Sequence, residues 1–183
     1  MEEIIKKIAK IFRKLKIPYV IIGGISASIW GRPRMTLDTD IVFFIQEEKI
    51  DSFLNLLKKE KFKVYPVKKI KEKLKTGLPV KIAYTKHFSI DLRLSTYKID
   101  ENAIKRAKVK KLFNVPLKIC SPEDLIIYKL LRFDEIDIFD IKNIILRRGK
   151  KLDWEYIDKE VKELAKETSN ENLIKNLEII KNL

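Results

Sequence analysis

The stretch that decides the fold is Asp38-Thr-Asp-Ile-Val-Phe-Phe-Ile45, in which two aspartates open a nearly unbroken apolar run. Side chains two positions apart on a β-strand project to the same face of the sheet. We therefore expect the carboxylates of Asp38 and Asp40 to point the same way at the start of a buried strand. Because buried charges are costly unless they are paired, hydrogen-bonded or bound to a metal, this pair favours a site for a divalent cation.

A glycine turn precedes this strand, within Val20-Ile-Ile-Gly-Gly-Ile-Ser-Ala27. Gly23 and Gly24 allow the backbone to approach a ligand closely, and the N-terminus of the short helix that follows directs free N–H groups toward a phosphate. Ser26 would add a hydroxyl donor, and Arg34, in the loop before the two aspartates, is a further candidate phosphate contact. A Gly-Gly pair is common in tight turns, so its weight here comes from its place ahead of the carboxylates.

The chain is strongly basic. Its 183 residues include 40 Lys and Arg against 26 Asp and Glu, which gives a formal net charge of +14. This surplus favours a polyanionic partner such as RNA, DNA or a nucleotide. The alternative is a solvated, heat-adapted surface, since the Lys-, Glu- and Ile-rich composition resembles that of a thermophile. Hydrophobic residues make up 45% of the chain, so it can bury a sizeable core and is not a disordered sequence.

Two further features concern the compartment. No apolar run reaches a membrane-spanning length and no signal peptide opens the chain, so we expect no membrane association. The single cysteine, Cys120, excludes an internal disulfide and fits a reducing cytoplasm. We therefore predict a cytoplasmic protein in which Cys120 is a small core residue.

The hydrophobic pattern divides the chain near residue 120. Helical and strand-like segments alternate before that point, with strands expected at 19–22, 40–45, 62–67, 80–84, 88–94 and in a hairpin of 109–113 with 115–119. The basic segment 68–75 predicts a short helix or a mobile loop. From Ser121 onward every segment has helical spacing, and Ser121 is a good N-cap. We therefore predict an α/β core, 1–120, and a helical C-terminal subdomain, 121–183.

A third carboxylate is needed for two-metal phosphoryl transfer, in which oxygen ligands hold two divalent ions about 4 Å apart. Asp91 is the candidate, because it interrupts the otherwise apolar strand Ile90-Asp-Leu-Arg-Leu94. The alternative is an ion pair with Arg93 along the strand face, or an edge position in water. Beside the two earlier aspartates, we favour Asp91 as a metal ligand. Magnesium suits such oxygen ligands and substrate phosphates, whereas one histidine and one cysteine cannot form a standard zinc site.

A lysine within an apolar helical segment is the next candidate. Lys129 lies in Leu125-Ile-Ile-Tyr-Lys-Leu-Leu131, where it either snorkels to the surface or presents its ammonium group to a cleft that binds a triphosphate. Asp137, on the next predicted helix, is placed to pair with Lys129 and orient it. The alternative for Asp137 is a place in the first turn of that helix, where negative charge is favoured.

At these residues the chain resembles the nucleotidyltransferase superfamily that shares the DNA polymerase beta palm fold. That superfamily has a Gly-Gly or Gly-Ser turn, a short helix, an Asp-x-Asp strand and a later single Asp, and the matching residues are Gly23-Gly24, Asp38-Thr-Asp40 and Asp91. The loop between them resembles abortive-infection-type nucleotidyltransferase toxins and their small prokaryotic relatives. In those, the helical half carries a lysine, an arginine and two aspartates, which Lys129, Arg132, Asp137 and Asp140 resemble. The serine that often follows the glycines directly is displaced here to Ser26.

The resemblance implies an α+β fold, a nucleotidyltransferase-like mixed β-sheet flanked by helices with a C-terminal helical subdomain. It implies an enzyme that moves a nucleoside monophosphate from an NTP, such as ATP, to an acceptor hydroxyl. Asp38, Asp40 and Asp91 would hold two Mg²⁺ ions, and Asp91 would also take the proton of the attacking hydroxyl. The glycine turn and Lys129 would hold the triphosphate. The net charge and the toxin relatives favour an RNA acceptor, such as tRNA, with a protein side chain as the alternative.

Two other readings of the sequence stay open. The first is a non-catalytic nucleotide- or RNA-binding module on the same fold. The second is a component of a toxin–antitoxin-type system that mainly engages a partner protein, with the apolar stripes of the C-terminal helices as its surface: Trp154, Ile157, Val161, Leu164, Leu173, Leu177 and Ile180. Such stripes more often close a domain's own core.

Overall fold

The computed structural model describes residues 1–182; Leu183, the last residue of the predicted helical subdomain, lies outside the described residues. The strands are β1 (Tyr19–Ile21), β2 (Asp38–Phe43), β3 (Val80–Ala83), β4 (Ser89–Leu94), β5 (Lys108–Leu112) and β6 (Val115–Ile119). The α-helices are α1 (Glu2–Leu15), α2 (Gly23–Trp30), α3 (Ile50–Lys59), α4 (Val67–Lys75), α5 (Lys98–Arg106), α6 (Pro122–Arg132), α7 (Glu135–Arg148), α8 (Trp154–Thr168) and α9 (Asn172–Lys181). The short 3-10 helices η1 (Glu47–Lys49) and η2 (Gly149–Lys151) precede α3 and follow α7.

The strands form one mixed sheet in the order β3-β4-β2-β1-β6-β5. In its centre, β2 is antiparallel to β1 and parallel to β4. The edge strands β3 and β5 are antiparallel partners of β4 and β6. The predicted α+β fold with a mixed sheet is thus confirmed, and so is the hairpin that β5 and β6 form.

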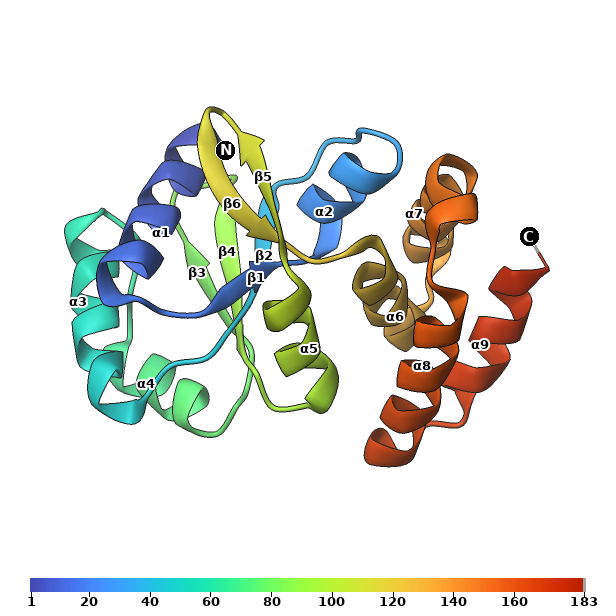
Figure 1. Ribbon diagram of the computed structural model, residues 1–183. Coiled ribbons are helices and arrows are strands. Elements are labelled where there is room, and N and C mark those ends of the chain that lie inside the picture. The colour runs from blue at the N-terminus through green and yellow to red at the C-terminus, as the bar shows by residue number, and fades with distance from the viewer. Residues whose placement is uncertain (183) are drawn as a thin grey trace.

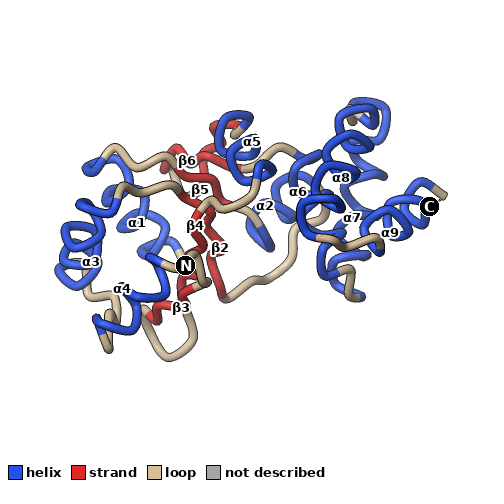
Figure 2. The backbone as a smooth tube through the Cα atoms, turned by 90° about the horizontal axis from the view of Figure 1, so that it is seen from below, coloured by secondary structure: helices blue, strands red, loops and turns tan. Residues whose placement is uncertain are grey.

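Helices cover both faces of the sheet. In Figure 1, α1, α3 and α4 lie on one side of the strands and α2 and α5 on the other. Figure 2 shows the same layers from below, with α6 to α9 beyond α2. In the first layer Phe12 of α1, Phe43 of β2 and Phe53 of α3 pack with ring centroids 5.4 to 5.7 Å apart. This aromatic packing anchors the far end of β2, the strand that opens with Asp38 and Asp40.

The predicted strand over residues 62–67 is wrong. No strand forms there, and Val67 begins α4, which confirms the helical alternative for residues 68–75. Lys63 donates one backbone hydrogen bond to the carbonyl of Ala83 at the sheet edge. Pro66 has no N–H group with which to continue such a ladder, so the chain turns into the helix.

The helical half begins at the predicted cap. The hydroxyl oxygen of Ser121 accepts a hydrogen bond from the backbone N–H of Asp124. The stripe of α9, Leu173, Leu177 and Ile180, is buried, so these side chains close the protein's own core rather than offering a docking surface.

The two predicted domains are in contact. Helix α6 packs against α2 and α5 of the first part as well as against α7 and α8. A division of the chain at residue 120 therefore stays a prediction. Within residues 1–182, no helix combines the length and the apolar character needed to cross a membrane.

Candidate active site

The glycine turn at the start of α2 touches the carboxylate of Asp40. Gly23 has a φ of +62°, in the left-handed region, and a Cβ atom on it would lie only 1.9 Å from Oδ2 of Asp40. The backbone of Gly24 hydrogen-bonds to the same carboxylate. Glycine meets both demands, because it adopts this conformation without strain and leaves room for the oxygen. The turn is therefore built around Asp40.

Asp38, Asp40 and Asp91 line one cavity of about 510 Å³. The parallel pairing of β2 with β4 places Asp40 directly opposite Asp91, so residues far apart in the sequence share one face of the sheet. Ser89 donates its hydroxyl hydrogen to Oδ1 of Asp38. The structure thus brings the three predicted aspartates together, while their role as metal ligands stays a prediction.

A lysine that the sequence reasoning missed lies among these carboxylates. Lys81 on β3 is the cross-strand partner of Asp91. Its Nζ lies 2.9 Å from Oδ2 of Asp38 and 3.5 Å from Oδ2 of Asp91. The alternative ion pair between Asp91 and Arg93 is wrong, because Arg93 donates two hydrogen bonds to Asp100 instead.

Burial and neighbouring charge act differently on the three carboxylates. Burial, followed by the charges of Asp91 and Asp38, raises the pKa of Asp40. Burial also raises the pKa of Asp91, against the opposing charge of Lys81. For Asp38, burial is outweighed by hydrogen bonds from Lys81 and Ser89, which lower its pKa. At Asp40 and Asp91 the environment therefore disfavours the ionised carboxylate, because burial and neighbouring negative charge outweigh the hydrogen bonds and cations that would favour it.

The donor set fits magnesium in type, since it consists of hard carboxylate oxygens that line one cavity. The spacing of the three carboxylates differs from that of a formed metal site. Within residues 1–182, no group of three or more His, Cys, Asp or Glu side chains is placed so that it could hold a metal ion. The ammonium group of Lys81 pairs with both Asp38 and Asp91. A metal ion would therefore have to displace Lys81 and draw the carboxylates together.

Lys129 lies in a buried network of charges elsewhere along the cavity. Its Nζ is 2.8 Å from Oδ1 of Asp137 and 2.7 Å from Oδ2 of Asp140. The snorkelling alternative is wrong, because Lys129 is only 5% exposed. Asp137 pairs with Lys129 and also occupies the first turn of α7, where its N–H donates to the capping carboxylate of Asp134. That Asp137 orients Lys129 for a ligand stays a prediction.

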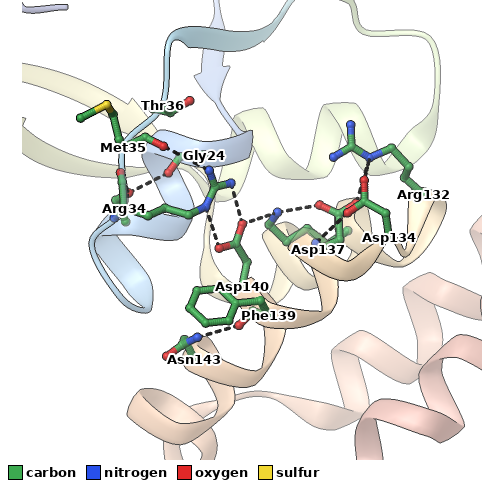
Figure 3. A network of polar contacts seen from close by, with 12 residues as sticks. Gly24, Arg34, Met35, Thr36, Arg132, Asp134, Asp137, Phe139, Asp140 and Asn143 are labelled. Carbon is green, nitrogen blue, oxygen red and sulfur yellow. Dashed lines mark hydrogen bonds and ion pairs between the residues drawn. The ribbon is translucent and has the colours of Figure 1, made fainter.

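Asp140 connects this network to the glycine turn, as Figure 3 shows. Nε and Nη2 of Arg34 each donate a hydrogen bond of 2.9 Å to the carboxylate of Asp140. Nη2 of Arg34 lies 3.4 Å from the position that a Cβ on Gly24 would take. The hydroxyl group of Ser28 bonds to the backbone of Arg34 and fixes the loop. Burial of Asp140 is outweighed by the hydrogen bonds from Arg34 and Lys129, which lower its pKa.

Ser26 lies outside the cavity, which corrects its prediction as a phosphate contact. Its side chain is 0% exposed and donates a hydrogen bond of 2.8 Å to the carbonyl of Ile21. Three positions after Gly23 on the helix, the hydroxyl group faces β1 instead of the turn. Cys120 is buried, as predicted for a core residue.

The comparison with protein families decides the classification. A family model described as "Nucleotidyltransferase of unknown function (DUF6036)" matches residues 1–182. The chain belongs to this nucleotidyltransferase family. The predicted superfamily is therefore confirmed, and the residues described above are the candidate active site of a nucleotidyltransferase. No curated protein sequence is significantly similar to the chain.

Two solved structures have a similar fold. Lincosamide antibiotic adenylyltransferase LnuA, bound to lincomycin, is 16% identical with a TM-score of 0.51, over 78% of this chain and 94% of that one. ANT(2'')-Ia in complex with adenylyl-2''-tobramycin is 15% identical with a TM-score of 0.53, over 86% of this chain and 92% of that one. At these identities the similarity establishes the nucleotidyltransferase fold alone.

Proposed function

We propose that the protein is a Mg²⁺-dependent nucleotidyltransferase that moves a nucleoside monophosphate from an NTP to a hydroxyl group of RNA. One observation carries the proposal. Three carboxylates on adjacent strands line a cavity together with a glycine turn and with cations that include Arg34 and Lys129. Membership of a nucleotidyltransferase family supports it.

The three carboxylates are the candidate metal ligands. Asp38, Asp40 and Asp91 would hold the Mg²⁺ ions through oxygen atoms, which this ion prefers. When bound, the ions would neutralise triphosphate charge and polarise the reacting phosphate. Lys81 pairs with Asp38 and Asp91 and so offsets part of the cost of placing their charges together.

The triphosphate would lie between the glycine turn and Lys129. A lysine ammonium group has three N–H donors, and Asp137 and Asp140 accept from Lys129 at 2.8 and 2.7 Å. One donor is left for a phosphate oxygen. Because Asp137 and Asp140 already fix the ammonium group of Lys129, this side chain loses little conformational entropy when a phosphate binds.

The reaction exchanges one bond to phosphorus for another. The acceptor oxygen forms a bond to the α-phosphorus, and the bond from that phosphorus to the oxygen bridging toward the β-phosphorus breaks. Pyrophosphate leaves with the electron pair. Asp91, whose carboxylate lines the cavity, takes the proton of the acceptor hydroxyl as general base.

RNA is the proposed acceptor because the chain carries a net charge of +14, which attracts a polyanion. The antibiotics named for the two similar structures belong to those proteins. A toxin-like or regulatory use in the cytoplasm, with an antitoxin or other protein partner, is part of the proposal. It is supported by the toxin-like residue pattern of the helical half and by apolar side chains that α7 leaves exposed: Ile136, Phe139 and Leu146.

The proposal is tested by label transfer. The full chain is incubated with Mg²⁺, bulk RNA and each NTP labelled on its α-phosphate, beside Asp40→Asn and the surface variant Lys68→Gln. We expect labelled RNA from the wild type and from Lys68→Gln, and none from Asp40→Asn, with circular dichroism showing that all three are folded. If the wild type labels neither RNA nor protein yet binds RNA, the non-catalytic module is the better description.

A further inference from the structure

The carboxylates separate two lobes of the cleft. The first lobe holds the glycine turn, Arg34 and Lys129, as described above. The second lobe, of about 460 Å³, is lined by residues of α4, the loop before β3, and strands β2, β3 and β4. Helix α4 lies on the other side of the strands from α2, which begins with the glycine turn (Figure 1). Asp40, Asp91 and Lys81 line both lobes. The carboxylates therefore stand at the boundary between two spaces of similar size.

Transfer of a phosphoryl group requires such a division. The attacking and leaving oxygens lie roughly in line on opposite sides of the reacting phosphorus. If the triphosphate occupies the first lobe, the acceptor hydroxyl has to approach from the second. The second lobe is therefore the place for the acceptor, and the side chains that line it determine which acceptor fits.

The second lobe is lined by two carboxylates and three cations. Its acidic residues are Asp40 and Asp91, both already assigned to the metal ions. Its cations are Lys73, Lys81 and Arg93. Arg93 is neutralised by Asp100 at 2.6 Å, and Lys81 pairs with the carboxylates.

Lys73 is the remaining cation. It lies on α4 between Lys71 and Lys75, which pair with Asp51 and Glu47. Among residues 1–182, Lys73 has no carboxylate partner within ion-pair distance, and it is partly buried at the wall of the lobe. The lobe thus offers one free positive charge, and no acid of its own that an amine-bearing acceptor could use.

We propose that the second lobe binds the end of an RNA strand, with Lys73 contacting a backbone phosphate next to the reacting hydroxyl. This assignment rests on the proposed function, and it names the acceptor subsite and a positioning residue within it. The apolar wall formed by Ile22, Pro79 and Val80 suits the face of a sugar or base beside that phosphate.

The test measures RNA binding separately from catalysis. Fluorescence anisotropy follows a short single-stranded RNA with a 5′-fluorescein and a free 3′-hydroxyl, in Mg²⁺ without NTP, over a series of salt concentrations. The variants are Lys73→Gln and the matched control Lys68→Gln, which removes an exposed charge from the same helix outside the lobe. We expect Lys73→Gln to weaken binding about tenfold. The slope of log Kd against log salt should fall by about 0.7, as for the loss of one phosphate contact to a single strand.

Kinetics provide the second readout. With NTP present, Lys73→Gln should raise the KM for RNA and leave the KM for ATP unchanged. Equal effects of Lys73→Gln and Lys68→Gln on binding and salt slope would overturn the proposal, as would transfer to a protein or an amine-bearing small molecule that Lys73→Gln leaves unaffected. A wild type that transfers nothing refutes the proposed function instead, and the salt slope still decides whether Lys73 contacts RNA.

Discussion

The ammonium group of Lys81 lies 2.9 Å from the carboxylate of Asp38 and 3.5 Å from that of Asp91. A lysine on an edge strand therefore neutralises the carboxylates that we assign to metal ions. Because the lysine side chain is more than half exposed, the ammonium group can leave for solvent at little cost. Lys81 and a divalent cation then compete for the same oxygen atoms.

Removing this competitor should strengthen metal binding. We expect Lys81→Met to raise the affinity for Mn²⁺, used in place of Mg²⁺, by up to about fivefold, the size expected for one solvent-exposed ion pair. Electron paramagnetic resonance of free Mn²⁺ measures this without any turnover. Lys86→Gln, in the loop between β3 and β4, removes a charge that lies outside the cavity and serves as the control. Weaker Mn²⁺ binding by Lys81→Met would show that the lysine assists the metal site instead of opposing it.

Asp140 should contribute strongly to the stability of the folded protein at neutral pH. It is buried and holds both Arg34 and Lys129, so Asp140→Asn leaves Arg34 without its carboxylate partner and Lys129 with Asp137 alone. The change should cost about 3–5 kcal/mol of unfolding free energy at neutral pH. Urea unfolding measures the loss. Asp51→Asn, which breaks the exposed pair with Lys71, should cost no more than about 1 kcal/mol.

The sign of the pH dependence follows from the lowered pKa of Asp140. A carboxylate whose pKa is lower in the folded state stabilises the fold above its unfolded pKa, about 3.9. That stabilisation disappears as the pH falls through the folded-state pKa. The difference between wild type and Asp140→Asn should therefore be constant at neutral pH and shrink below about pH 4. A difference that grows on acidification would mean that Asp140 is not the ionised partner of these cations.

The sequence predicts that Asp38, Asp40 and Asp91 come together, because the signal is local. Asp38 and Asp40 follow from the two-residue period of one strand, and Asp91 from a charge inside an apolar strand. Lys81 is missed because its place depends on the register of β3 against β4, which the sequence of one strand does not determine. Ser26 is misplaced because the predicted start of the helix does not tell which way the side chain of Ser26 faces.

Asp140 illustrates the remaining gap. Its spacing from Asp137 places both on one side of α7, but its partner Arg34 lies 106 positions earlier in the chain. Only the packing of α7 against α2 brings the two together. Local pattern therefore predicts which residues are unusual, whereas tertiary packing decides which of them meet.

Gly23 offers the sharpest test of the site, because a second glycine, Gly77, has a similar backbone conformation and serves as a control. Gly23 and Gly77 have φ values of +62° and +72°, and a Cβ would lie 1.9 Å from the carboxylate of Asp40 in the first and 2.9 Å from Cγ2 of Thr96 in the second. Alanine at either position should cost about 1–2 kcal/mol for the left-handed backbone, seen as a lower Tm. Gly23→Ala must also push Asp40 aside, so it alone should abolish nucleotide transfer and weaken Mn²⁺ binding. If Gly23→Ala retains both while Gly77→Ala shows the same fall in Tm, the contact between the turn and Asp40 has no part in the chemistry.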